Sequence, residues 1–283
     1  MKKIKIFVAY HKESLLIKND VFEPIQVGRA NSQYKLNMIG DDTGENISNK
    51  NSIYCELTAL YWVWKNCKDI DYIGICHYRR FFLYSLPFKE LFQMYFSKLK
   101  YYCKKLLFIN DGYNFNCASF SNEKEIADLL NSFSKQIVND VNENRIELFA
   151  LKPIKVPTKN IRGLFVNPAG ESVIVLLEEI VKIKYPNLYP HLIAVLYGSS
   201  FSYANMIIMK SETLDIYASF LFDVLAEHEK RVVNTGWCQN PLTEKCYSRL
   251  SGYLGELLTA TFIHYFKNNN PDKIRLLYQL QIL

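Results

Sequence analysis

Apolar and polar positions along the chain fall into two kinds of pattern, short apolar runs and stretches with helical spacing. Ile4 to Tyr10 is a largely apolar run that ends at the polar residue His11, which predicts a buried strand leading to the edge of a site. From Ser52, which can cap a helix, apolar residues recur at helical spacing as far as Asn66. Residues 71–76 form a second apolar run. Strand, helix and strand in this order predict a parallel βαβ unit.

The rest of the chain continues to alternate between the two patterns. Strand-like patterns occupy residues 146–156, as one or two strands, and 203–209. The segments with a helical pattern are residues 121–133, 171–184, 214–228 and 253–266. Because no repeat, low-complexity tract or Pro/Gly/Ser linker divides the chain, we expect one α/β domain over residues 1–283.

Composition places this domain inside the cell. The 283 residues are 49% hydrophobic and 22% charged, which is enough apolar material for a substantial core. The seven cysteines form no Cys-x-x-Cys pair and lie mostly in apolar runs, as reduced thiols do. The N-terminus lacks a signal-peptide cleavage site, and no apolar stretch reaches the roughly 18 residues of a membrane span. We therefore expect a cytoplasmic protein.

A basic and aromatic segment follows the second strand. Between residues 87 and 108, aromatic and leucine side chains alternate with five lysines, which predicts a helical insertion at about residues 83–118. Such a helix can lie on the anionic inner face of the cell membrane, or pack on the domain with its lysines in water. The net charge of +6 suits anionic lipid, a nucleotide diphosphate or nucleic acid. No nucleic-acid-binding motif is present, so we expect no nucleic-acid partner.

The cluster His77-Tyr78-Arg79-Arg80 ends the second predicted strand. Two arginines offer planar donors that match phosphate oxygens, and a histidine can donate a hydrogen bond or a proton to a leaving phosphate. Ligands of parallel sheets lie beyond the carboxyl ends of the strands, so His11 and this cluster are expected to converge on a diphosphate. The alternative is a basic surface turn paired with neighbouring acids.

Two further features can carry chemistry. The polar loop at residues 40–51 has glycines for tight turns and Asn, Asp and Ser side chains that can bond a ribose, a uracil edge or sugar hydroxyls. It can equally be a solvated turn. Glu256 stands ahead of an apolar stretch, where a carboxylate can act as base for an acceptor hydroxyl or simply favour a helix start. The isolated histidines His191, His228 and His264 show no metal-ligand spacing.

Three ordered motifs carry a resemblance to a known family: MIGDDTGENISNKN at residues 38–51, CELTALYWVWKN at 55–66 and DYIGICHYRRFF at 71–82. They closely resemble the bacterial galactofuranosyltransferase family that was once catalogued only as a domain of unknown function. Weaker similarity continues through residues 185–186, 204–210 and 247–258, so the resemblance covers most of the chain.

The resemblance implies a GT-A-like glycosyltransferase fold, with a mostly parallel central sheet flanked by helices. It also implies transfer of galactofuranose from UDP-galactofuranose to a glycan or lipid-linked glycan acceptor, in the biosynthesis of capsule, exopolysaccharide or O-antigen. By position, His77, Arg79 and Arg80 would lie beside the donor phosphates. Glu56 would line or brace the pocket. The residues expected around the donor are Tyr10, His11, Asp41, Asp42, Asn46, Lys50, Tyr61 and Trp64.

The expected reaction is a single inverting displacement, with Glu256 as the base and positive charge to stabilise departing UDP. Many GT-A enzymes supply that charge with an Asp-x-Asp motif and Mn²⁺ or Mg²⁺. Here the strand ends in HYRR instead, so we expect His77, Arg79 and Arg80 to replace much of the metal's role. Two alternatives stay open: another UDP-hexose donor, such as UDP-galactopyranose, or a non-catalytic glycan-binding module of a polysaccharide assembly complex.

Overall fold

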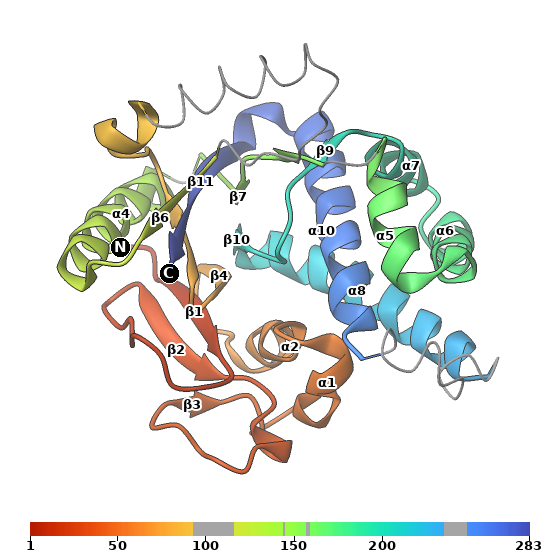
Figure 1. The fold of residues 1–283 in the computed structure, drawn as a ribbon, viewed down its shortest axis with the longest axis horizontal. Coiled ribbons are helices and arrows are strands. Elements are labelled where there is room, and N and C mark those ends of the chain that lie inside the picture. Colours follow the sequence, from red (N-terminus) through yellow and green to blue (C-terminus); the bar gives the residue numbers. More distant parts are fainter. Residues whose placement is uncertain (93–115, 144, 157–158, 235–247) are drawn as a thin grey trace.

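The computed structural model describes residues 1–92, 116–143, 145–156, 159–234 and 248–283 (Figure 1). The strands are β1 (Ile4–Tyr10), β2 (Phe22–Gln26), β3 (Ile39–Gly40), β4 (Tyr72–His77), β5 (Arg80–Leu83), β6 (Cys117–Phe120), β7 (Leu148–Leu151), β8 (Ile154–Lys155), β9 (Ser200–Phe201), β10 (Ile207–Lys210) and β11 (Ile274–Ile282). The α-helices are α1 (Asn51–Tyr54), α2 (Leu57–Asn66), α4 (Glu123–Glu143), α5 (Ile161–Ala169), α6 (Glu171–Lys184), α7 (Tyr189–Leu196), α8 (Ser211–Asn234) and α10 (Leu250–Asn269). Short 3₁₀ turns are η1 (Arg29–Asn31), η2 (Ser48–Lys50) and η4 (Pro271–Lys273).

The main sheet has a parallel half and a mixed half. Strands β3, β2, β1 and β4 are adjacent and parallel, as the βαβ prediction requires. Beyond them, β4, β10, β7, β11 and β5 close into a five-stranded mixed barrel, with β6 paired to β11. The α/β class is confirmed, but a mostly parallel sheet was wrong for this half. The tight hairpin from β4 to β5 and the reversed direction of β10 make it mixed.

Helices cover both faces of the sheet, which is why its strands are apolar on both sides (Figure 1). Along β1, Phe7 and Ala9 belong to one hydrophobic cluster, whereas Ile6 and Val8 belong to the other. This alternation follows from the two-residue repeat of a strand. The first cluster packs beneath α2, α6, α8 and α10, and the second packs beneath α4. Most of the predicted helices are confirmed, and α6 has the predicted bounds.

Two sequence expectations change in the structure. The helix expected from Ser52 to Asn66 is broken into α1 and α2, because Cys55 adopts a left-handed φ of 52°. Ser52 consequently lies inside α1 and does not cap it. Strands β2 and β11 were not anticipated. The expected insertion at about 83–118 lies mainly outside the described residues. Within the described part of the chain, no helix is long and apolar enough to cross a lipid bilayer.

Candidate active site

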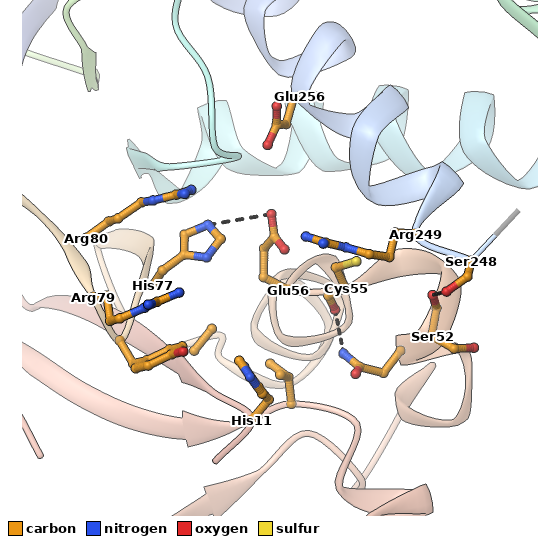
Figure 2. A pocket seen from close by; sticks show the side chains of 14 residues that line it. His11, Ser52, Cys55, Glu56, His77, Arg79, Arg80, Ser248, Arg249 and Glu256 are labelled. Carbon is orange, nitrogen blue, oxygen red and sulfur yellow. Dashed lines mark hydrogen bonds and ion pairs between the residues drawn. The ribbon is translucent and has the colours of Figure 1, made fainter. Parts of the chain in front are cut away.

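A pocket of about 480 Å³ opens at the carboxyl ends of β1 and β4 (Figure 2). The two strand ends are adjacent, because Ala9 pairs with His77 and the Tyr78 backbone N–H donates to the Ala9 carbonyl at 3.1 Å. The residues that line the pocket are Ala9, His11, Val27, Asn51, Ser52, Cys55, Glu56, His77, Tyr78, Arg79, Arg80, Ser248, Arg249 and Glu256. The structure thus brings His11 and the His77 to Arg80 cluster together in one pocket, and its ligand stays a prediction.

Three guanidinium groups surround the pocket. Figure 2 shows Arg79 and Arg80 on one side of Glu56 and Arg249 on the other. Arg79 lies over the Tyr78 ring, 5.2 Å from its centroid, which holds the side chain beside the strand end. Among the described residues, none of the three arginines forms a salt bridge with a carboxylate. Arg249 also hydrogen-bonds the Cys55 side chain. The planar donors of these arginines are suited to an anionic ligand.

Two carboxyl groups share the pocket with these arginines. Glu56 stands at the N-cap of α2, and its Oε1 accepts a hydrogen bond from Asn205 Nδ2 at 2.8 Å. Glu256 projects from α10. Burial, and next the negative charge of Glu56, raise the pKa of Glu256 to about 8, although Arg80 and Arg249 act in the opposite direction. At neutral pH, Glu256 is therefore mostly a neutral carboxylic acid.

His77 links these groups. Its Nε2 lies 2.7 Å from the Ala204 carbonyl oxygen and 3.6 Å from Glu56 Oε1. A carbonyl oxygen can only accept, so Nε2 carries a proton. At the rim, burial lowers the pKa of His11, and the positive charges of Lys12 and Arg79 add to this effect. His11 is thus predominantly neutral at pH 7 and can accept or donate a single proton.

Asp41 and Asp42 of the predicted donor loop lie outside the pocket lining. Asp41 is fully buried and accepts hydrogen bonds from the backbone N–H groups of Gly28 and Arg29 at 2.9 and 3.1 Å, and from the Ser48 hydroxyl. Asp42 lies 3.9 Å from the Arg29 guanidinium. The carboxylate of Asp41 holds η1 and η2 together, which leaves it no access to a sugar nucleotide.

Two other residues of this loop that were expected around the donor also contact the protein. Asn46 accepts from the Ser48 backbone N–H at 3.2 Å and donates to the Gly44 carbonyl at 3.0 Å. Lys50 forms a salt bridge of 2.8 Å with Glu229 on α8. Neither side chain lines the pocket, whereas Asn51, at the end of the loop, does. Turn and protein contacts therefore account for the predicted donor residues of the loop, and Asn51 is its contribution to the pocket.

Three aromatic residues expected around the donor also lie elsewhere. Tyr10 is buried, and its hydroxyl donates to the Leu15 carbonyl at 2.9 Å. On the outer side of α2, Tyr61 donates to Glu45 at 2.9 Å and Trp64 Nε1 donates to Asp215 at 2.8 Å. These residues brace the helices around the pocket and do not line it.

Known proteins place the chain in a family and a fold. Residues 5–269 match the family described as a domain of unknown function, DUF4422. The chain belongs to the DUF4422 family. No curated protein sequence is similar enough to count as a match. The fold is similar to that of the apo structure of the WbbM bifunctional glycosyltransferase, with a TM-score of 0.79 and 24% sequence identity. The similarity covers 99% of this chain and 45% of that chain.

The sequence patterns gave no functional role to one residue that lines the DUF4422 pocket, Cys55, or to one that lies behind it, Asn205. Cys55 lines the pocket, and burial raises the pKa of its thiol to about 11. Asn205 is buried and contacts Glu56 from behind. Neither residue belongs to a recognisable catalytic motif. A signal was available only in the resemblance, which included residues 204–210 and 55–66.

The carboxyl and histidine side chains of the pocket do not form an evident metal centre. Among the described residues, no group of three or more His, Cys, Asp and Glu side chains is arranged to hold a metal ion. The three arginines of the pocket are suited to a phosphate group.

Proposed function

We propose that this DUF4422 chain is a glycosyltransferase that transfers a galactofuranosyl residue from UDP-galactofuranose to a glycan acceptor in cell-surface polysaccharide biosynthesis. The observation that carries the proposal is the pocket at the ends of β1 and β4. Two glutamates share it with three arginines that form no salt bridge with a carboxylate among the described residues. The similarity to the WbbM fold supports a glycosyltransferase, and the GT-A-like assignment rests on the family resemblance. Transfer of galactofuranose rests on the family resemblance. Residues 1–283 would form one such domain.

The arginines support a diphosphate site beside the end of β4. Arg79 lies in the turn from β4 to β5 and Arg80 begins β5, and parallel sheets bind their ligands beyond the carboxyl ends of strands such as β4. Their planar donors match phosphate oxygens, and positive charge fixed before the reaction stabilises the charge that develops on departing UDP. His77 lies beside them. We propose these three residues as the group that takes over much of a metal's electrostatic role.

A second cavity of about 670 Å³ shares the His11 wall with the pocket and gives room for the nucleoside. Gln26, at the end of β2, holds the wall of this cavity in place. Its amide donates to the Tyr34 carbonyl at 2.7 Å and accepts from the Leu36 backbone N–H at 2.8 Å. The Tyr34 side chain is 78% exposed at this wall, so its ring is available to stack on a base. The cavity replaces the 40–51 loop as the proposed nucleoside site.

The test is a donor panel. The protein is incubated with UDP-galactofuranose, UDP-galactopyranose or UDP-glucose and with synthetic or lipid-linked galactoside acceptors, and the product is identified by mass and linkage. The proposal expects transfer from UDP-galactofuranose with inversion at the anomeric carbon. Transfer from another UDP-hexose would keep the enzyme class and change the donor. Glycan binding without any UDP binding would reject the enzyme and favour a glycan-binding module.

A further inference from the structure

A two-residue turn just before β10 contacts three side chains of the pocket. The Ala204 carbonyl accepts from His77 Nε2 at 2.7 Å, and the Ala204 backbone N–H donates to the Glu256 carboxyl group. The next residue, Asn205, donates from Nδ2 to Glu56 Oε1 at 2.8 Å. One short turn thus hydrogen-bonds His77 and both carboxyl groups of the pocket.

This turn is held in a costly backbone conformation. Ala204 and Asn205 have φ angles of 75° and 49°, in the left-handed region that non-glycine residues avoid. In the described parts of the chain, the other non-glycine residues with positive φ are Cys55 and Arg249, and both line the same pocket. Such conformations are unfavourable and persist where the surroundings enforce them. Strain therefore concentrates around Glu56, which directly follows Cys55.

The orientation of the Asn205 amide is fixed by its other contacts. Nδ2 also donates to the Gly252 carbonyl at 3.1 Å, and Oδ1 accepts from the Thr259 hydroxyl at 3.2 Å. The Gly252 carbonyl oxygen can only accept a hydrogen bond, so the Asn205 atom beside it must be the amide nitrogen. The same nitrogen lies beside Glu56. Asn205 is 1% exposed, and a buried amide donor stabilises a charged carboxylate strongly. The position of Glu56 at the N-cap of α2 also favours negative charge.

We infer that Glu56 is the general base of the proposed transfer and that Asn205 is the residue that positions it. This inference rests on the proposed function. As the acceptor oxygen bonds to the anomeric carbon, the bond from that carbon to the diphosphate oxygen breaks and its electron pair leaves with UDP. The acceptor hydroxyl proton passes to the Glu56 carboxylate.

The surroundings of Glu256 make it the less suited of the two carboxyl groups. A base must be ionised to accept a proton, and burial raises the pKa of Glu256 to about 8, so Glu256 is largely neutral at pH 7. Glu256 remains able to donate a hydrogen bond from its neutral carboxyl group.

The test compares variants of Glu56 and Asn205 in transfer and in UDP binding. Glu56→Gln keeps the size and hydrogen-bonding capacity of the side chain but removes the base, so we expect kcat to fall about 10²- to 10⁴-fold. Glu56→Asp retains a carboxylate and should recover part of this loss. Asn205→Gly removes the amide while tolerating the left-handed backbone, and should lower kcat with the UDP dissociation constant within about threefold of wild type. The exposed Glu212 on α8 gives a matched control, Glu212→Gln, with unchanged kcat.

The outcomes separate this inference from the proposed function. If the wild-type protein transfers no sugar from any nucleotide donor, the proposed function itself fails. If it transfers sugar and Glu56→Gln keeps kcat within about threefold of wild type, the assignment of Glu56 is wrong. If Asn205→Gly weakens UDP binding and thermal stability but leaves kcat intact, Asn205 is only structural. UDP binding by each variant shows that it has folded.

Discussion

Alkaline pH should suppress transfer through the ionisation of Glu256. In the free enzyme, burial and the nearby charge of Glu56 raise the pKa of Glu256 to about 8, against the opposing charges of Arg80 and Arg249. Above that pH a second negative charge appears beside Glu56, in the pocket that must receive an anionic diphosphate. Donor binding and transfer should therefore weaken as pH rises.

The size of the effect follows from the pKa. With a pKa of about 8, about nine-tenths of the molecules carry a neutral Glu256 at pH 7 and about one-tenth do so at pH 9. If only the neutral form is competent, kcat/KM falls about tenfold between these pH values and then about tenfold for each further unit. The Cys55 thiol, with a pKa of about 11, stays protonated over this range.

The assay is a pH profile of kcat/KM at saturating acceptor for wild type, Glu256→Gln and the surface control Glu212→Gln. We expect wild type and the control to share an alkaline limb near pH 8. Glu256→Gln should lose this limb and keep kcat/KM at pH 7 within about tenfold of wild type, because an amide stays neutral at every pH. A wild-type rate that rises through pH 8, combined with an inactive Glu256→Gln, would refute this reasoning and make Glu256 the base.

Three further predictions concern the donor. Arg79→Gln should weaken UDP binding about 10- to 100-fold, as loss of a charge-assisted hydrogen bond does. The surface variant Arg145→Gln should bind UDP as wild type does. Equal UDP affinities of wild type and Arg79→Gln by calorimetry would contradict this prediction. Tyr34→Ala should weaken UDP binding about 5- to 50-fold and leave pyrophosphate binding unchanged, because only the base would stack on the ring. Equal losses of affinity for both ligands would show that the nucleoside does not bind in that cavity. Transfer should persist in EDTA, because His77, Arg79 and Arg80 supply the positive charge that stabilises departing UDP. Activity that vanishes in EDTA and returns only with Mn²⁺ or Mg²⁺ would show that a metal ion supplies this charge.

The part of the site that could be predicted from the sequence depends on local strand geometry. His11 directly follows β1, and Arg79 comes two residues after the end of β4. The carboxyl ends of adjacent parallel strands lie at the same edge of a sheet. The same local patterns predicted α6 and α8. These features required no knowledge of what packs against them.

Other features depend on contacts between distant segments. The left-handed turn at Asn205 is stabilised by Gly252 and Thr259 of α10, about fifty residues away in the chain. No local sequence pattern predicts such a turn. Likewise, composition cannot distinguish a polar loop that binds a ligand from one whose side chains hydrogen-bond the protein backbone. Asp41 is of the second kind, because it accepts hydrogen bonds from the backbone N–H groups of Gly28 and Arg29. The mixed barrel closes because β11, near the C-terminal end, pairs with the two much earlier strands β5 and β7.

A crystal structure of the protein with UDP bound tests the proposed donor site most directly. We expect the diphosphate against Arg79 and Arg80, the uracil in the cavity beside Tyr34, and the open side of the diphosphate facing Glu56. UDP bound away from the ends of β1 and β4, or no density for UDP at concentrations that saturate other UDP-sugar enzymes, would contradict the central claim that this pocket is a donor site.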